Sequence, residues 1–242
     1  MTPFTLVMAY YENAGMLLAQ MKRWCELPAD IREGLSVVVI DDGSPVRPAL
    51  EVCTPLRLTA LRSNLEDFQL WRMGVDVRWN QDACRNVGVR EAKTSWVLLT
   101  DMDHVVPVQT WQRLMKLPLK KSRVYRFGRV SAPALDPYKS HPNSWALTRN
   151  VYWQIGGYDE ALAGNYGTDG DFLNRARREA DLIELSEVLV RYPREVVPDA
   201  STTTLERKRP EDRENVNRIC KARAADPDWK PLHFSFPCER LV

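Results

Sequence analysis

Long apolar runs, clustered cysteines and a marked excess of one charge are all lacking in this chain of 242 residues. No apolar run approaches the roughly 18 residues that a membrane-spanning helix needs. The first apolar run, at 4–9, is followed at once by polar residues, so we also expect no signal peptide. Lys and Arg number 34 and Asp and Glu 32, and this net charge of +2 excludes a strong overall attraction to nucleic acid or membrane.

The cysteines are few and widely spaced. Their odd number and their spacing favour neither a zinc site nor a redox pair. We therefore expect free thiols in a reducing compartment, which predicts a cytoplasmic protein. The five positions are Cys25, Cys53, Cys84, Cys220 and Cys238.

Strand and helix patterns alternate along most of the chain. Apolar or alternating runs predict strands at 4–9, 36–40, 56–61, 96–100, 124–130 and 143–148, with a loop at 136–143. Helical spacing predicts helices at 17–24, 80–93 (with Asp82 as N-cap), shortly after Pro107, and at 169–180. This order predicts an α/β fold in which helices flank a mostly parallel sheet.

The domain organisation that we expect is simple. Residues 1–197 form one domain, with a first half at 1–104 and a second half at 105–197. The polar, charged remainder at 198–242 is a C-terminal extension that either packs on the domain or is partly mobile.

Two aspartates, Asp101 and Asp103, directly follow the apolar run at 96–100. Open α/β sheets bind ligands at the carboxyl ends of their strands, where this pair is expected to lie. Mg²⁺ is usually held by one or two carboxylates together with substrate phosphates, so the pair suits Mg²⁺ or Mn²⁺. The same pattern also occurs in ordinary surface turns, so its neighbours in the sequence decide the interpretation.

Further motifs appear in a fixed order around this pair. They are Asp41-Asp42-Gly43-Ser44, the segment 82–88, Asp101-Met102-Asp103, the segment 155–160, and the segment 166–172. As an ordered set over residues 4–178, they resemble the GT-A (Rossmann-like) glycosyltransferases, most closely the family-2-like enzymes. The stretch 169–175 is also similar to the acceptor-site motif of animal galactosyltransferases.

The resemblance implies that 1–104 is the nucleotide-binding half and 105–197 the acceptor half. It also implies how a nucleotide sugar would be bound. Asp42 would recognise the base, usually uracil, although a turn aspartate that caps the next element is the alternative. Arg85 and Asn86 would reach the donor, and Asp101 would lie near its ribose or the metal. Asp103 would be the direct metal ligand.

Other residues receive roles from the resemblance as well. The C-terminal part of many GT-A enzymes supplies a third metal ligand, which would be His233, while His104 and His141 stay open as candidates. Gly156 and Gly157 suit a loop whose backbone approaches the sugar.

Asp169 corresponds to the catalytic base of the family's Glu-Asp pair. It would take the proton of the acceptor hydroxyl as that hydroxyl attacks the anomeric carbon. Thr168 stands where the glutamate is usual, which leaves acceptor recognition open. Asp171 and Trp145 are the expected acceptor-binding residues, with helix-dipole and core-packing roles as their alternatives.

The resemblance thus implies a metal-dependent, inverting glycosyltransferase that uses a nucleotide sugar, most commonly a UDP-sugar, with Mn²⁺ or Mg²⁺. A nucleotidyltransferase is disfavoured because residues 9–13 contain no glycine. A non-catalytic nucleotide- or glycan-binding module is the remaining alternative.

The acceptor is a soluble glycan, a protein side chain or a hydroxylated DNA base. The basic residues between Lys116 and Arg129, with those at 207–209, motivate the DNA alternative, which predicts salt-sensitive binding.

Overall fold

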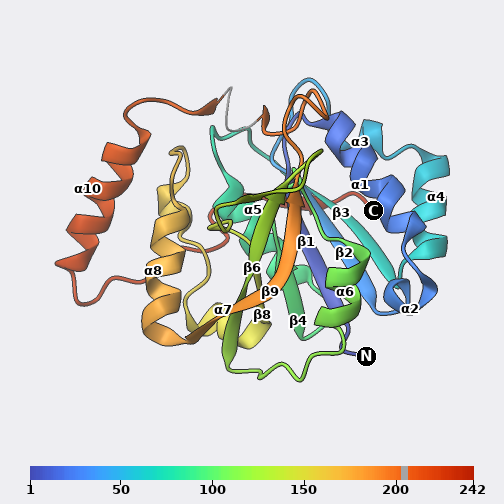
Figure 1. Ribbon diagram of the computed structural model, residues 1–242. Helices are drawn as coiled ribbons and strands as arrows, with labels where there is room; N and C mark the ends of the chain where they lie inside the picture. Colours follow the sequence, from blue (N-terminus) through green and yellow to red (C-terminus); the bar gives the residue numbers. More distant parts are fainter. Residues whose placement is uncertain (203–206) are drawn as a thin grey trace.

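The computed structural model describes residues 1–202 and 207–242, and it has a central sheet with helices on both faces (Figure 1). Its strands are β1 (Phe4–Tyr10), β2 (Leu35–Asp41), β3 (Asp67–Met73), β4 (Trp96–Leu99), β5 (His104–Val105), β6 (Arg123–Ser131), β7 (Asp136–Tyr138), β8 (Trp145–Thr148), β9 (Asp181–Arg191) and β10 (Cys238–Arg240). Its helices are α1 (Ala14–Glu26), α2 (Ala29–Arg32), α3 (Ala49–Val52), α4 (Pro55–Asn64), α5 (Gln81–Glu91), α6 (Val108–Leu114), α7 (Arg149–Gln154), the 3₁₀-helix η1 (Glu160–Leu162), α8 (Asp169–Glu179) and α10 (Asp212–Ala224).

The described strands form one sheet in the order β10-β3-β2-β1-β4-β8-β6-β9-β5, with β7 on β6. Strands β3, β2, β1 and β4 run parallel, β8 is antiparallel between β4 and β6, and β9 is parallel to β6. The carboxyl ends of the parallel strands therefore meet at one edge, at the top of Figure 1. The predicted α/β fold with a mostly parallel sheet is confirmed.

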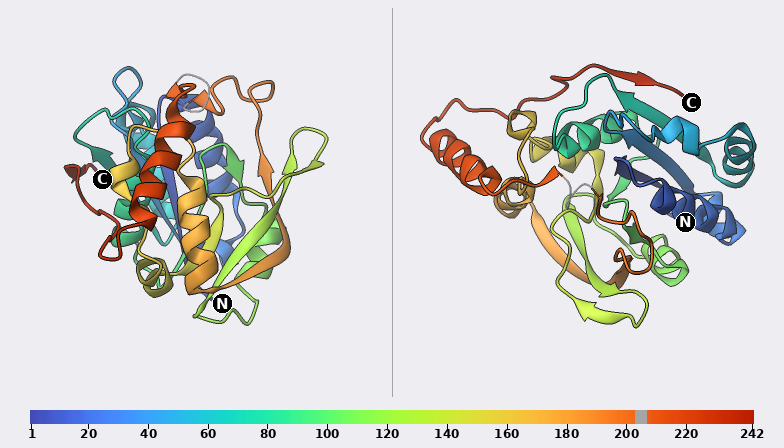
Figure 2. Two further views of the ribbon diagram at one scale, coloured as in Figure 1. Left: turned by 90° about the vertical axis from the view of Figure 1, so that its left-hand side faces the viewer. Right: turned by 90° about the horizontal axis from the view of Figure 1, so that it is seen from above.

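Alternation along β1 divides the core into two layers. Phe4, Leu6 and Met8 belong to the cluster that includes α1, α2 and α6, while Val7 and Ala9 belong to the cluster that includes α5, α7 and α8. Successive strand side chains point to opposite faces, so a run that is apolar throughout must be covered on both sides. The view from above shows helices on either side of the sheet (Figure 2).

Helix α5 lies unusually close to the sheet because it carries a glycine at the contact. A Cβ atom on Gly88 would lie 2.2 Å from Val7 Cγ1 and 2.8 Å from Ile40 Cδ1, which no side chain tolerates. The helix begins just before the site-bearing residues 82–86. Its close packing therefore fixes the height of those residues relative to the ends of β1 and β4.

Some predicted elements differ from the structure. The expected strand at 56–61 is wrong, because these residues lie in α4, where Pro55 occupies the first turn that suits proline. The N-cap position of α5 is occupied by Asn80 and not by Asp82, and the Asn80 side chain makes no capping hydrogen bond. The predicted loop at 136–143 contains the short strand β7.

The described parts of the C-terminal extension contact the domain at several points. Strand β10 adds to the sheet antiparallel to β3, and α10 lies beside α8 (Figures 1 and 2). The Glu160 carboxylate accepts hydrogen bonds from the backbone N–H groups of Phe234 and Ser235 at 2.8 and 2.6 Å. Residues 203–206 of the extension lie outside the described part of the chain. Among the described helices, none is long and apolar enough to cross a bilayer.

Candidate active site at the carboxyl edge of the sheet

Asp101 and Asp103 follow β4 at the edge where the parallel strands end. Their side chains are 23% and 12% exposed, and both line a cavity of about 420 Å³. Ligand pockets commonly measure roughly 300 to 1,000 Å³, so the cavity is large enough for part of a small-molecule substrate. The buried strand delivers both carboxylates to this cavity, as the sequence pattern predicts.

Cationic and polar partners keep the Asp101 carboxylate ionised. Burial alone would favour the neutral acid, but His141 and Arg85 outweigh it and hold the pKa of Asp101 well below its usual range. Arg85 donates to Oδ1 at 2.6 Å, and His141 Nε2 lies 3.2 Å from Oδ2. Asp101 is therefore a fixed negative charge at the cavity wall.

Asp103 is held in the same way by its neighbour His104. His104 Nδ1 lies 2.7 Å from Asp103 Oδ1, and its Nε2 lies 3.1 Å from Arg129. Because a guanidinium only donates, His104 Nε2 must accept and Nδ1 must carry the proton that goes to Asp103. Burial lowers the pKa of His104, which agrees with this neutral tautomer, and the His104 contact lowers the pKa of Asp103 despite burial.

The two carboxylates fit a divalent cation that brings further ligands with its substrate. Ionised oxygens are the ligands that Mg²⁺ and Mn²⁺ prefer. Among the described residues, no group of three or more His, Cys, Asp or Glu side chains is arranged to hold a metal ion. The donor set therefore fits a cation that carries substrate phosphates rather than a cage of protein ligands.

Asp169 lines the same cavity, at the first turn of α8. Its Oδ1 accepts a hydrogen bond from the Asn143 side chain, and Asn143 and His141 belong to the loop before β8. The structure thus brings Asp169 into one cavity with Asp101 and Asp103, which lie 68 and 66 residues earlier in the sequence. A carboxylate in a polar cavity can accept a proton from a substrate bound there.

Asp42 lies at the end of β2, in a turn that Asp41 holds by accepting from the N–H groups of Ser44 and Ala49 at 2.8 and 2.7 Å. Asp42 is 1% exposed, and burial raises its pKa to about 7 against the opposing effect of Arg207. Among the described residues, its Oδ1 has no hydrogen-bond partner.

Arg207 of the C-terminal extension covers Asp42. Its guanidinium donates to Asp42 Oδ2 at 2.8 Å and to Asp76 at 3.0 Å, and it lies 3.5 Å from the centre of the Tyr11 ring. A flat cation therefore stacks on an aromatic face and occupies a carboxylate oxygen at the same time. This state leaves that face and that oxygen closed to any other ligand.

Two further residues of the extension reach the same edge. Asp199 accepts from the backbone N–H groups of Gly15 and Met16 at 2.6 and 2.9 Å, at the start of α1. Ser201 donates to Asp103 Oδ2 at 2.6 Å. The segment before residue 203 thus follows the ends of β1 and β4.

Comparisons with known proteins agree with this geometry at the level of the fold. No protein-family model matches the chain, and no curated protein matches it by sequence. Among solved structures, TarS from S. aureus in complex with UDP-GlcNAc matches with a TM-score of 0.71 and 14% identity over 95% of this chain and 68% of that chain. A mannosyltransferase from Pyrobaculum calidifontis in complex with GDP-Man and Mn²⁺ matches at 0.60 and 17% over 96% and 66%. GalNAc-T7 with UDP, GalNAc and Mn²⁺ matches at 0.60 and 12% over 80% and 44%.

The chain has the GT-A fold. The predicted resemblance is therefore confirmed at the level of the architecture. In this GT-A chain the cavity with Asp101, Asp103 and Asp169 lies where the ends of the parallel strands open, and the predicted roles of single residues can be compared with their positions.

Arg85 and Asn86 occupy different environments in the GT-A chain. Arg85 reaches the site and clamps Asp101, while its guanidinium lies 4.8 Å from the centre of the Tyr158 ring. Asn86 is fully buried, and its amide bonds the backbone of Tyr158, the Tyr152 hydroxyl and Glu160. Asn86 therefore holds the 156–160 loop in place and does not reach a donor in this state.

His233 and the glycine pair lie away from the carboxylates. His233 Nε2 bonds the Gly156 carbonyl at 2.7 Å, and the ring packs edge-on against Trp153. Gly157 has a φ of 56°, and a Cβ there would lie 2.9 Å from Asn86 Oδ1. The two glycines therefore let the loop approach Asn86 closely. In this state His233 does not lie at the expected metal position, and Gly156 and Gly157 do not line the cavity.

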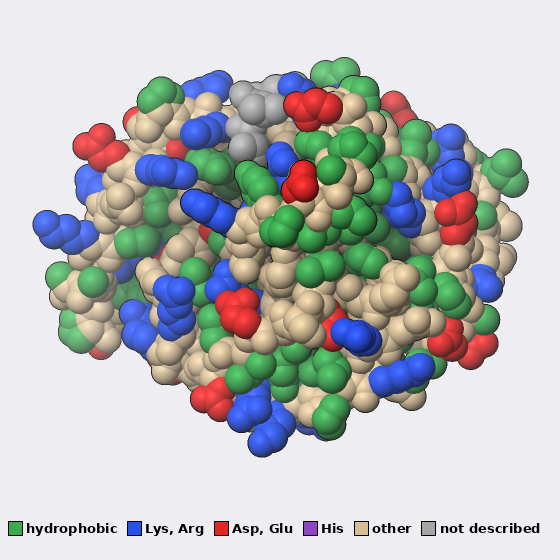
Figure 3. Space-filling model, viewed as in Figure 1, with side chains coloured by type: hydrophobic (Ala, Val, Ile, Leu, Met, Phe, Trp, Pro, Cys, Tyr) green, Lys and Arg blue, Asp and Glu red, His purple; other side chains and the backbone are tan. Residues whose placement is uncertain are grey.

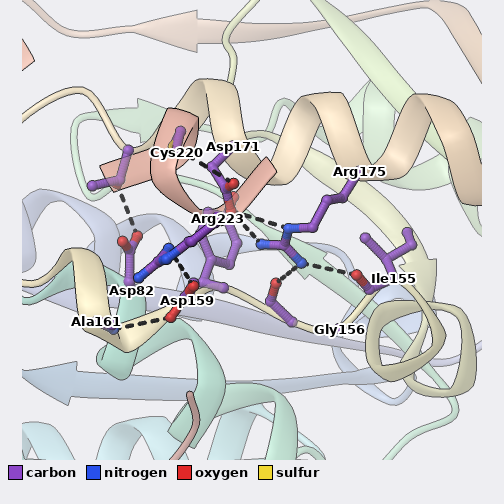
Figure 4. Close-up of polar contacts among 12 residues, drawn as sticks. Asp82, Ile155, Gly156, Asp159, Ala161, Asp171, Arg175, Cys220 and Arg223 are labelled. Atoms are coloured by element: carbon purple, nitrogen blue, oxygen red, sulfur yellow. Dashed lines mark hydrogen bonds and ion pairs between the residues drawn. The ribbon is translucent and has the colours of Figure 1, made fainter. Parts of the chain in front are cut away.

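The expected acceptor residues also lie elsewhere. Trp145 is 0% exposed and is not among the residues that line the cavity in this state. Asp171 lines a separate cleft of about 810 Å³ between α8 and α10, where it accepts from Arg175 at 2.7 and 3.0 Å (Figure 4). Residues two apart on a helix face different directions, which explains why Asp169 and Asp171 separate.

Thr168 and Asp82 interact beside the base position. The Thr168 hydroxyl donates to Asp82 Oδ1 at 3.1 Å, and both side chains are buried. Burial raises the pKa of Asp82 to about 7. The residue that replaces the usual glutamate is thus part of the contact between α8 and α5.

The basic residues of 116–129 do not form one surface with those at 207–209. Arg129 lines the cavity, Arg126 pairs with Glu184, and Arg207 is buried in ion pairs. Lys121 lies at the opposite edge of the sheet, where its carbonyl accepts from Thr148. On the face in Figure 3, Lys and Arg side chains are spread among acidic and apolar ones.

Several residues of the cavity wall were not assigned roles from the sequence. Asn143, Ser201 and Arg129 contact Asp169, Asp103 and His104, and Arg207 covers Asp42. No motif marks them, because each comes from a loop or strand distant in sequence from its partner. The sequence around Arg207 shows only a run of basic residues, and such a run predicts an exposed surface and not a buried ion pair with Asp42.

Proposed function

We propose that this protein is a metal-dependent glycosyltransferase that moves a sugar from a nucleotide sugar, preferably a UDP-sugar, to an acceptor hydroxyl. The observation that carries the proposal is that Asp101, Asp103 and Asp169 line one cavity at the carboxyl edge of a GT-A sheet. Solved relatives of this fold have been crystallised with UDP-GlcNAc and with Mn²⁺. The five free thiols support a cytoplasmic location.

Base recognition is assigned to Asp42 and Asn80. Uracil presents one N–H between two carbonyls, so it requires an acceptor flanked by a donor. Asp42 Oδ1 and the side-chain amide of Asn80 are buried without a hydrogen-bond partner among the described residues. The backbone N–H of Asn80 donates to Asp42 Oδ2 at 3.4 Å, so the two side chains lie close together. Unsatisfied buried polar groups are costly, and a bound base would satisfy them.

Asp101 and Asp103 would hold Mn²⁺ or Mg²⁺, which would neutralise charge on the departing diphosphate when bound. Asp169 accepts the proton of the acceptor hydroxyl, whose oxygen attacks the anomeric carbon. The bond from that carbon to the diphosphate breaks, and its electron pair leaves with the nucleoside diphosphate. Attack opposite the leaving group inverts the anomeric configuration.

The test uses Mn²⁺, a panel of nucleotide sugars and water as the acceptor, with release of the nucleoside diphosphate as the measurement. We expect metal-dependent hydrolysis that prefers a UDP-sugar. Asp103→Ala removes metal-dependent UDP binding, whereas Asp169→Asn keeps UDP binding and loses turnover. Hydrolysis that is absent while UDP binding persists would indicate a binding module instead, and equal loss of binding in both variants would contradict the base assignment.

A further inference from the structure

A chain of three hydrogen bonds, the first two of them buried, ends on the Asp169 carboxylate. Trp145 Nε1 donates to the Tyr158 hydroxyl at 3.0 Å, and the Tyr158 hydroxyl donates to Asn143 Oδ1 at 3.0 Å. Asn143 Nδ2 then donates to Asp169 Oδ1 at the cavity wall. Trp145, Tyr158 and Asn143 are 0%, 1% and 2% exposed, so water does not replace the partners in the first two bonds.

The chemistry of the first donor fixes the direction of the whole chain. An indole N–H can only donate, so the Tyr158 oxygen accepts from Trp145 and its own proton goes to Asn143. Asn143 must therefore present its carbonyl oxygen to Tyr158 and its NH₂ group to Asp169. The Asp169 carboxylate, which only accepts, requires the same orientation of the Asn143 amide, so the direction of the chain is fixed from both ends.

The middle of the chain is also held mechanically. The Tyr158 ring stacks on Phe172 of α8 with centres 4.4 Å apart and an interplanar angle of 8°. Its backbone N–H donates to Asn86 Oδ1 at 3.0 Å. Phe172 lies one helical turn after Asp169, so the stacking ties the helix that carries Asp169 to the hydrogen-bond chain.

We propose that Trp145, Tyr158 and Asn143 are positioning residues that hold the Asp169 carboxylate in a single orientation. Asn143 occupies Oδ1, and Oδ2 takes the proton of the attacking hydroxyl. The inference rests on the proposed role of Asp169 as the base. It gives Trp145 a function other than the acceptor contact expected from the sequence, and it gives one to Tyr158, which lies in the 155–160 motif but received no role from the sequence.

Loss of orientation should affect the chemical step and spare donor binding. A misplacement of about 1 Å at a reacting group costs on the order of 100-fold in rate. For Tyr158→Phe, Trp145→Phe and Asn143→Leu we expect kcat for hydrolysis of the preferred UDP-sugar to fall about 10- to 100-fold. The KM for that donor and the affinity for UDP with Mn²⁺ stay within about twofold, since the hydrogen bonds to Asp42, Asp101 and Asp103 come from Arg207, Arg85, His141, His104 and Ser201 and not from this chain.

The matched control is Tyr125→Phe. Tyr125 is also a buried tyrosine, and its hydroxyl accepts from the Lys120 N–H at 2.7 Å, at the start of β6 and thus at the opposite edge of the sheet. This variant loses a comparable hydrogen bond without touching the chain to Asp169. We expect its kcat to equal that of the parent.

The outcomes separate this proposal from the proposed function. If Asp169→Asn removes turnover while Tyr158→Phe and Trp145→Phe both keep the parental kcat, the positioning role is overturned and the base assignment stands. If Asp169→Asn itself keeps turnover, the base assignment fails. A variant that loses kcat and UDP affinity together has lost its fold, and the remaining two variants then test the positioning role. If all three variants lose kcat and UDP affinity together, the proposal is overturned.

Discussion

At the residue scale, Asp42 illustrates how burial prepares a side chain for recognition and makes it sensitive to pH. The carboxylate is nearly inaccessible, and burial raises its pKa to about 7 although Arg207 opposes the shift. Only the ionised form offers the full acceptor strength that an imide N–H requires. If Asp42 recognises the base as proposed, donor binding depends on pH near neutrality.

The consequence is a pH-dependent affinity for the donor. Below about pH 7 the fraction of ionised Asp42 falls about tenfold per pH unit, and the affinity for UDP-GlcNAc should fall in the same proportion. Above that pH the affinity is level. A UDP-sugar is the suitable ligand because its diphosphate diester does not titrate in this range. Titration calorimetry across this range measures the effect.

Asp42→Asn is the control for this prediction. The amide cannot ionise, so the variant binds weakly and its affinity stays flat across the same range. Asp82 also has a pKa raised to about 7, and it is unchanged in the variant. A pH dependence that persists in Asp42→Asn would assign the titration to another group.

The sequence predicts some residues of this site and not others for a physical reason. Asp42 and Asp101 follow closely after the ends of β2 and β4, and Asp169 begins α8. A local pattern therefore gives their position at the sheet edge. Asn143 and Ser201 reach the site from segments whose course depends on tertiary packing. A local pattern also does not show what a side chain faces, so it leaves acceptor contact and core packing both open for Trp145.

At the scale of elements, the position of α5 depends on the absence of a side chain at Gly88. The helix carries Arg85, which clamps Asp101, and Asn86, which holds the loop of Tyr158. Gly88→Ala would force Cβ against Val7 and Ile40 and push the helix outward. We expect a loss of about 1–3 kcal/mol in the free energy of unfolding, measured by urea denaturation.

Gly170→Ala is the matched control in α8. A Cβ at Gly170 meets no atom within 4 Å, and alanine favours a helix over glycine by roughly 0.5–1 kcal/mol in a helix interior. This variant should be as stable as the parent or slightly more so. Equal destabilisation by both substitutions would mean that packing against β1 and β2 does not set the position of α5.

The elements themselves were predictable where one local period dominated. The buried strands β1, β2 and β4 and the helix α5 follow from runs of apolar residues or from helical spacing. Strands β3, β9 and β10 were not predicted, because their pairing partners are distant and two of them are only partly buried. The segment 56–61 was assigned to a strand although Pro55 begins a helix there, since its alternation resembles both structures.

At the scale of the whole molecule, the C-terminal extension and the domain share one binding edge. Arg207 stacks on Tyr11 and bonds Asp42, and Ser201 bonds Asp103. Arg207 closes Asp42 Oδ2 and the Tyr11 ring beside the Oδ1 that is proposed to bind the base, and Ser201 occupies one oxygen of a proposed cation ligand. We therefore expect donor binding to displace Arg207 from the Tyr11 face.

The most direct test of the account is a crystal structure with UDP and Mn²⁺, in which an anomalous difference map locates the metal. We expect a manganese peak at Asp101 and Asp103, uracil within hydrogen-bond distance of Asp42, and Arg207 withdrawn from Tyr11. Manganese bound elsewhere, or UDP bound with the Asp42 and Arg207 contact intact, would contradict it.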